Sequence, residues 1–180
     1  AGDFVALHGP SGCGKSTLIR TLIRLVPKSA HVTADKMAFK GQDILSMSEK
    51  EFREKILWQG IGLVPQSAMN ALKPVYRVGD QCIEAIQAHT DYSKAECEQI
   101  VEKLFDAVGL QAGMMKAYPH EFSGGMRQRS MIAMSLVLNP ALVIMDEPTT
   151  GLDVLVQERI LRNIKEIRKM SESSVSILLI

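Results

Sequence analysis

The chain has 180 residues, of which 46% are hydrophobic, 23% charged and 5% aromatic, as in an ordinary water-soluble globular protein. Its 21 Lys and Arg and 20 Asp and Glu leave a net charge of +1, so no nucleic-acid partner is expected. No apolar stretch reaches the roughly 18 residues of a membrane span, and the three cysteines, Cys13, Cys82 and Cys97, lack metal-ligand spacing and favour a reducing compartment without disulfides.

The first third of the chain alternates strand and helix. A short apolar run at 3–8 predicts a strand, and apolar residues at helical spacing predict a helix over 15–26 after a glycine-rich turn. A strand end is expected at 37–39. Ser48, with Glu51 three residues later, predicts a capped helix to about Leu57. A buried strand over 61–64 then stops at Pro65.

The middle of the chain has a helical pattern throughout. We expect helices over 79–88, over 93–108 before Gly109, and from Gly124 to just before Asn139. Cys97 falls on the apolar face of the second of these and is interpreted as core packing.

The end of the chain returns to the first pattern. A strand is expected over 142–145, followed by a helix capped by Asp153. The apolar residues 175–180 predict a further strand that the sequence does not complete. Because Ala1 is not Met either, we expect the chain to be a fragment. The predicted fold is α/β: a core of 1–66 and 139–180 with a parallel sheet, and an inserted α-helical subdomain over 67–138.

A phosphate-binding loop lies between the first strand and the first helix. It matches GxxxxGK[ST] with Gly9, Pro10, Ser11, Gly12, Cys13, Gly14, Lys15, Ser16 and Thr17. Glycines let backbone N–H groups turn inward around a phosphate, and the helix N-terminus adds partial positive charge. We therefore predict that Lys15 neutralises the terminal phosphates and that the Ser16 hydroxyl binds Mg²⁺.

Two acids follow the strand over 142–145. Because α/β folds bind ligands at the carboxyl ends of their strands, Asp146 and Glu147 are expected beside the phosphate loop. Asp146 would hold Mg²⁺ through its water shell. Glu147 would accept a proton from the water that attacks the γ-phosphate, which makes hydrolysis the expected chemistry.

Together with these motifs, the segment 122–126, with sequence FSGGM, makes the chain resemble the ATP-binding cassette (ABC) ATPases over essentially its whole length. The segment is similar to the signature loop of that family, usually LSGGQ, with Phe and Met at its two ends. The resemblance implies that Ser123, Gly124 and Gly125 contact the γ-phosphate bound by an opposite subunit. It implies an α/β P-loop NTPase core with ATP and Mg²⁺ as ligands.

Two further residues gain roles from this resemblance. Gln66 is similar to the glutamine of the family's Q-loop, which senses Mg²⁺ and the attacking water, and Asp153 to the aspartate of the D-loop, which contacts the second subunit. The family's adenine-stacking aromatic residue would precede Ala1, and its switch histidine would follow Ile180. The four histidines of this chain do not occupy that place; they are His8, His31, His89 and His120.

The segments 66–75 and 118–129 resemble the oligopeptide and dipeptide importer branch, with Lys73 where Asn is usual. Nickel importers are close relatives. The resemblance implies permease subunits, a second ABC ATPase subunit and, indirectly, a solute-binding protein as partners, at the cytoplasmic face of the plasma membrane. The Pro-containing loop is a suitable surface for a short helix of a membrane subunit.

Three other classes share the phosphate loop. A DNA-repair or chromosome-maintenance ATPase would insert long coiled-coil arms, but only a compact helical region fits between Gln66 and Ser123. A regulatory module that no longer hydrolyses ATP would have a degenerate acidic pair, whereas Glu147 is present. A kinase would leave 123–125 unused.

Overall fold

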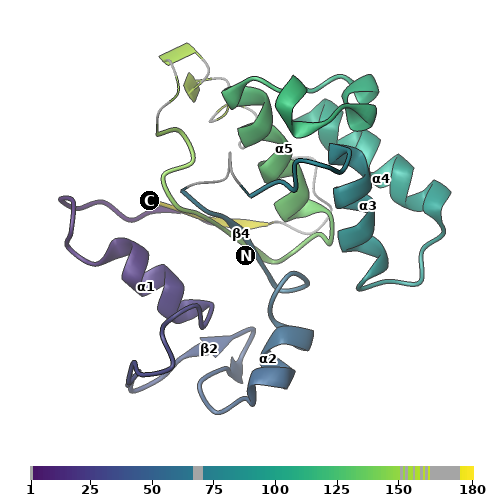
Figure 1. Cartoon of the computed structure of the whole chain (residues 1–180). Coiled ribbons are helices and arrows are strands. Elements are labelled where there is room, and N and C mark those ends of the chain that lie inside the picture. The colour runs from purple at the N-terminus through teal and green to yellow at the C-terminus, as the bar shows by residue number, and fades with distance from the viewer. Residues whose placement is uncertain are drawn as a thin grey trace.

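The computed structural model describes residues 2–66, 71–150, 152, 154, 155, 157, 158, 160, 162 and 175–180. Four strands form a parallel sheet in the order β1-β6-β5-β4 (Figure 1). They are β1 (Phe4–Ala6), β4 (Ile61–Val64), β5 (Leu142–Met145) and β6 (Ser176–Leu179). The predicted α/β class with a parallel sheet is confirmed.

Helices cover both faces of the sheet (Figure 1). On one side lie α1 (Lys15–Leu22), α2 (Glu49–Lys55) and a hairpin of β2 (Ala38–Phe39) and β3 (Gln42–Asp43). On the other lie α3 (Val78–Gln87), α4 (Lys94–Ala107), α5 (Gly124–Leu136) and two short 3-10 helices, η2 (Ala112–Lys116) and η3 (Pro119–Glu121). None of the helices in the described part of the chain combines the length and apolar character needed to cross a bilayer.

The alternation of side chains along β5 creates the two cores. Val143 and Met145 belong to the cluster with α3, α4 and α5, whereas Ile144, between them, belongs to the cluster with α1 and α2. Successive strand residues point to opposite faces, so a strand buried on both sides is apolar without interruption. That is why a continuous run, without polar alternation, marks this strand in the sequence.

The helical side is tightly packed. Gly62 lies where α5 approaches β4, and a Cβ there would overlap the Ser135 carbonyl oxygen. Cys82 and Cys97 are fully buried in this cluster, as the sequence predicts for Cys97. Burial raises the pKa of the Cys82 thiol to about 12, which makes it a packing group rather than a nucleophile.

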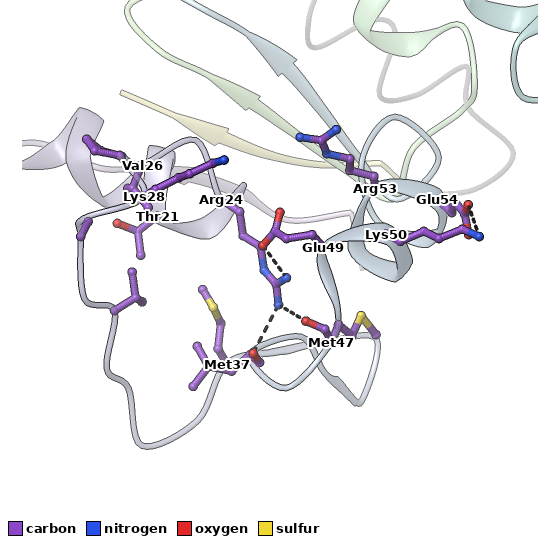
Figure 2. A pocket seen from close by; sticks show the side chains of 14 residues that line it. Thr21, Arg24, Val26, Lys28, Met37, Met47, Glu49, Lys50, Arg53 and Glu54 are labelled. Atoms are coloured by element: carbon purple, nitrogen blue, oxygen red, sulfur yellow. Dashed lines mark hydrogen bonds and ion pairs between the residues drawn. The ribbon is translucent and has the colours of Figure 1, made fainter.

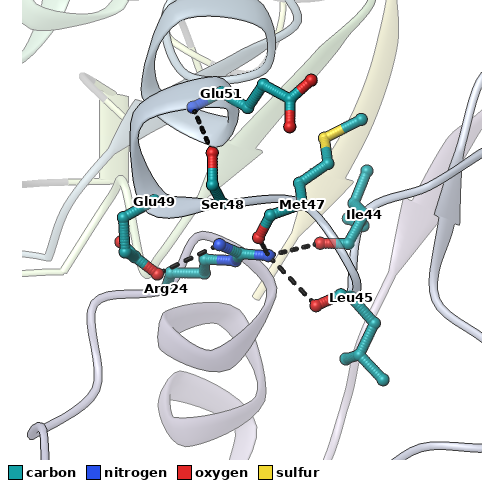
Figure 3. A network of polar contacts seen from close by, with 7 residues as sticks. All are labelled: Arg24, Ile44, Leu45, Met47, Ser48, Glu49 and Glu51. Atoms are coloured by element: carbon teal, nitrogen blue, oxygen red, sulfur yellow. Dashed lines mark hydrogen bonds and ion pairs between the residues drawn. The ribbon is translucent and has the colours of Figure 1, made fainter.

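On the opposite side, Arg24 joins α1 to the segment before α2 (Figure 3). Its Nη2 donates to the carbonyls of Ile44 and Met47 at 2.6 and 2.8 Å, and its Nη1 donates to Glu49 Oε1 at 3.0 Å. The guanidinium carbon lies 4.5 Å from the centre of the Phe52 ring. The helix expected to reach Val26 ends at Leu22 instead, because Arg24 adopts a positive φ of 56°.

A pocket of about 1090 Å³ opens beside the same end of α1 (Figure 2). Its lining includes four cationic side chains and two acidic ones, Arg24, Lys28, Lys50, Arg53, Glu49 and Glu54. The phosphate loop precedes the other end of α1, about 12 Å away for an eight-residue helix. The pocket is therefore separate from the site that the motifs define.

Candidate nucleotide-binding site

The phosphate loop runs between β1 and α1, and its backbone requires glycine at two places. Gly12 and Gly14 have φ values of 81° and 98°, in the left-handed region that side chains disfavour. Gly14 is the N-cap of α1, so the first free N–H groups of the helix follow it directly. Lys15 donates from Nζ to the carbonyls of Gly9 and Pro10, both at 2.9 Å. The ammonium group therefore lies against the loop.

Ser16 and Asp146 are brought together from opposite ends of the chain. The Ser16 hydroxyl, in the first turn of α1, donates to Asp146 Oδ1 at 3.2 Å. Asp146 directly follows β5 and is only 7% exposed. A hydroxyl and a carboxylate are oxygen ligands of the kind that Mg²⁺ prefers, so this pair fits the predicted cation.

A cation at this point would have few protein ligands. No group of three or more His, Cys, Asp and Glu residues that could hold a metal occurs among the residues that the structure describes. Mg²⁺ usually keeps several waters and binds one or two carboxylates together with substrate phosphates. The oxygens of Ser16 and Asp146 fit a Mg²⁺ ion that is bound together with a phosphate ligand.

Glu147 lies one residue further along, at the carboxyl edge of the sheet. Gln66, just after the neighbouring strand β4, donates from Nε2 to Glu147 Oε2 at 2.8 Å. The two residues are 81 positions apart in the chain, and the parallel pairing of β4 with β5 brings them together. The structure thus joins the two residues for which the sequence predicts roles around the attacking water.

The backbone of Glu147 is unusual. Its φ of 46° lies in the left-handed region, and its N–H donates to the Ile180 carbonyl at 3.1 Å. The side chain of Thr150 also donates to Glu147 Oε2, at 3.0 Å. Sequence analysis assigns Thr150 no such contact. The signal that could have found it is the three-residue spacing, because a turn returns the chain to Glu147.

The segment 123–125 opens α5 as predicted. The exposed Ser123 is its N-cap and accepts from the N–H of Met126 at 3.3 Å. Among the described residues no hydrogen bond joins this segment to the phosphate loop. Asp153, also a predicted site residue, lies outside the described residues, as do 67–70 of the loop after Gln66.

A strand, a glycine-rich loop and a helix, with two acids at the end of a neighbouring strand, define a phosphate-loop nucleotide-binding protein of the α/β class. The family model described as ABC transporter matches residues 1–150. The chain therefore belongs to the ABC transporter family, and the resemblance stated from its motifs is confirmed.

Curated relatives are named for peptide transport. The dipeptide transport ATP-binding protein DppD of Bacillus subtilis is 42% identical over 98% of this chain and 53% of its own length. The oligopeptide transport ATP-binding protein OppD of Escherichia coli is 40% identical over 97% of this chain and 52% of its own. The chain thus spans about half the length of the curated relatives it matches.

Solved structures share the fold. The dimeric bacterial ABC transporter cassette MJ0796 superposes with a TM-score of 0.82 at 24% identity, over 99% of this chain and 74% of that one. The post-hydrolysis dimer of MJ0796, bound to ADP and Pi, gives 0.81 at 25% identity with the same coverage. The cbiO1 protein of Clostridium perfringens, part of an ABC transporter complex, gives 0.80 at 26% identity, over 99% and 66%.

Proposed function

We propose that this protein is the ATP-binding and ATP-hydrolysing subunit of an ABC importer for dipeptides or oligopeptides. The observation that carries the proposal is the meeting of Gln66 with Glu147, and of Ser16 with Asp146, at the edge of the sheet beside a phosphate loop. Family membership and relatives named for peptide transport support it.

The phosphates of ATP bind at the loop 9–17. Its backbone N–H groups and the N-terminus of α1 attract the negative charge, and the glycines allow the loop to approach closely. Lys15 neutralises the terminal phosphates by exchanging its carbonyl partners at Gly9 and Pro10 for phosphate oxygens. Lys15 can make this exchange by a movement of its flexible side chain alone.

Ser16, Asp146 and Gln66 hold the cation. Mg²⁺, when bound, neutralises charge that develops on the phosphates during the reaction. Ser16 offers its hydroxyl oxygen, and Asp146 contributes a carboxylate that its hydrogen bond to Ser16 already orients. Gln66 offers its amide from just beyond the end of β4.

Glu147 is the general base. Its carboxylate takes a proton from a water as that water bonds to the γ-phosphorus, the bond from phosphorus to the bridging oxygen breaks, and ADP leaves. The side chain must reach within roughly 2.6–3.2 Å of the water for this transfer. The contact between Glu147 and Gln66, a residue that would orient the same water, suits that role.

Two cassettes act as a pair, each phosphate loop facing Ser123, Gly124 and Gly125 of the other, with Asp153 also at the contact. Dimeric relatives support this arrangement. Permease subunits, which receive solute from a binding protein, hold the pair peripherally at the cytoplasmic face of the plasma membrane. We assign 1–66 and 139–180 to the nucleotide-binding core and 67–138 to the helical subdomain that meets the permease.

The test uses the full-length protein assembled with its permease and ATPase partners. Peptide-loaded binding protein is added, and the rate of ATP hydrolysis is measured for the wild type, for Glu147→Gln and for Glu102→Gln. Glu102 is an exposed residue of α4 and provides a matched control. We expect stimulated hydrolysis in the wild type and the control, and a loss of about a hundredfold or more in Glu147→Gln.

The outcomes separate the parts of the proposal. If peptide gives no stimulation while basal hydrolysis persists, the transported solute is nickel or another compound and the ATPase assignment stands. Hydrolysis that survives Glu147→Gln unchanged would contradict the role of Glu147 as the base. No hydrolysis at all in the complex would contradict the enzymatic activity.

A further inference from the structure

We propose that Thr150 is a positioning residue for Glu147, and that its hydroxyl fixes which oxygen of the Glu147 carboxylate faces the attacking water. The inference rests on the proposed function, because it concerns the general base of ATP hydrolysis. The observation behind it is a hydrogen bond of 3.0 Å that Thr150 Oγ1 donates to Glu147 Oε2.

Both donors that reach the carboxylate in the described part of the chain use the same oxygen. Gln66 Nε2 lies 2.8 Å from Oε2, and Thr150 Oγ1 lies 3.0 Å from the same atom. The second oxygen, Oε1, receives no hydrogen bond from any described residue. Two donors occupy the two lone-pair sites of Oε2, so Oε1 is left as the atom that can accept a proton from water.

The two donors differ in how they are held. Gln66 reaches Glu147 from the segment just after β4, and the proposed function gives its amide a second task at the cation and the water. Thr150 is three residues away, in a turn whose own backbone bond runs from the Thr150 N–H to the Glu147 carbonyl at 3.2 Å. When Gln66 engages the cation and the water, Thr150 is therefore the partner that can stay on Glu147.

The side chain of threonine suits this task. Its branched Cβ restricts χ1 to few rotamers, whereas glutamate has three rotatable bonds and is poorly ordered without partners. The backbone of Glu147, with φ at 46°, sets the direction in which the side chain leaves the turn. Backbone and hydroxyl together then determine where the carboxylate lies.

Three substitutions in the assembled full-length protein test this, with kcat and KM for ATP as the readouts. Thr150→Val keeps the shape and removes the donor, whereas Thr150→Ser keeps the donor. Thr90→Val makes the same change in the turn after α3, where the hydroxyl donates to the Ile86 carbonyl and accepts from the Tyr92 N–H. We expect Thr150→Val to lower kcat by about tenfold to a hundredfold with KM within about twofold. Thr150→Ser and Thr90→Val should stay within about threefold of the wild type.

A second readout separates positioning from a general structural effect. In the Glu147→Gln background, Thr150→Val should lower the residual rate by less than about twofold, because the base it positions is gone. Equal rates for Thr150→Val and Thr90→Val, or a rise in KM at constant kcat, would overturn the inference while ATP hydrolysis by the wild type stands. No hydrolysis by the wild-type complex would overturn the proposed function, and this inference with it.

Discussion

The helices α1 and α4 end in the same hydrogen-bond pattern with different residues. In α4 the N–H groups of Leu110 and Gly109 bond to the carbonyls of Phe105 and Asp106. In α1 the corresponding bonds run from Leu25 and Arg24 to Arg20 and Thr21. Both are Schellman endings, which need one residue in the left-handed conformation. Gly109 fills that position in α4, and Arg24 fills it in α1, with φ values of 71° and 56°.

What stabilises each ending also differs. In α4, Phe105 and Leu110 on either side of the turn are both buried, which is the apolar contact that often accompanies this motif. In α1, Leu25 is 58% exposed, and the ending depends on the polar contacts of Arg24 across the loop before α2. One ending is therefore local in sequence, while the other depends on residues about twenty positions away.

The largest expected effect is at the apolar contact of α4. Leu110→Ala should lower the free energy of unfolding by about 2–5 kcal/mol, because it removes a buried side chain and leaves a cavity. The equivalent change in α1, Leu25→Ala, should alter it by less than about 0.5 kcal/mol, because the side chain is exposed. Urea unfolding of both variants measures the difference, and similar values for the two would contradict the comparison.

The side chain of Arg24 stabilises the ending of α1 through its hydrogen bonds. Arg24→Ala should destabilise the protein by about 1.5–3 kcal/mol, since a charged donor to three carbonyls is lost. Arg24→Gly loses the same contacts but relieves the left-handed backbone, so it should be about 1 kcal/mol less harmful. Thermal unfolding of Arg24→Ala and Arg24→Gly measures this difference in stability. If the alanine variant is as stable as the glycine variant, the backbone at position 24 is not strained.

Gly109→Ala gives the backbone contribution alone. At φ 71° a Cβ is strained, so we expect a loss of about 1–2 kcal/mol without any change in apolar contacts. Gly113→Ala is a suitable control, because a Cβ at Gly113 meets nothing within 4 Å. If both variants unfold at the same denaturant concentration, the conformation of Gly109 does not limit stability.

The smallest effect is at the other end of α4, where Ser93 and Glu96 form a complete capping box. Hydrogen bonds from the Ser93 side chain and backbone hold the pKa of Glu96 below its ordinary value of 4.5. Its contribution is therefore present above about pH 4.5 and is lost as the pH falls through the lower folded-state pKa. Unfolding curves for the wild type and Glu96→Gln should converge below pH 4.5; a constant separation from pH 3 to 7 would contradict this.

These two helix ends also show how far the sequence could be interpreted. Gly109 signals its ending directly, and the helix there stops at Ala107, one residue before the expected Val108. Near Arg24 the sequence signals an ending through Pro27, which predicts a helix as far as Val26. The earlier ending at Leu22 has no local signal, because the carbonyls that the Arg24 side chain binds belong to Ile44, Leu45 and Met47. The 3-10 helices at 112–116 and 119–121 were equally absent from the sequence-based prediction, since such short turns lack a periodic pattern.

The candidate site, too, has one part that the sequence could predict and one part that it could not. The phosphate loop could be predicted because binding a phosphate restricts residue types at fixed spacings. The contact of Glu147 with Gln66 depends on the register of β4 against β5, which no local pattern encodes. The contact with Thr150 has only the three-residue spacing as a local signal. The roles of these residues in hydrolysis stay predictions until the variants are measured.

The positive φ of Glu147 means that the residue type best for the stability of the fold differs at this position from the one needed for the proposed chemistry. A side chain in this region costs the folded state about 1–2 kcal/mol relative to glycine, and asparagine tolerates it better than glutamate does. Glycine or asparagine at 147 would relieve this backbone strain, but would remove the carboxylate that we propose as the base. Laboratory evolution for thermal resistance alone is therefore expected to replace this glutamate, whereas selection for the proposed ATP hydrolysis is expected to retain it.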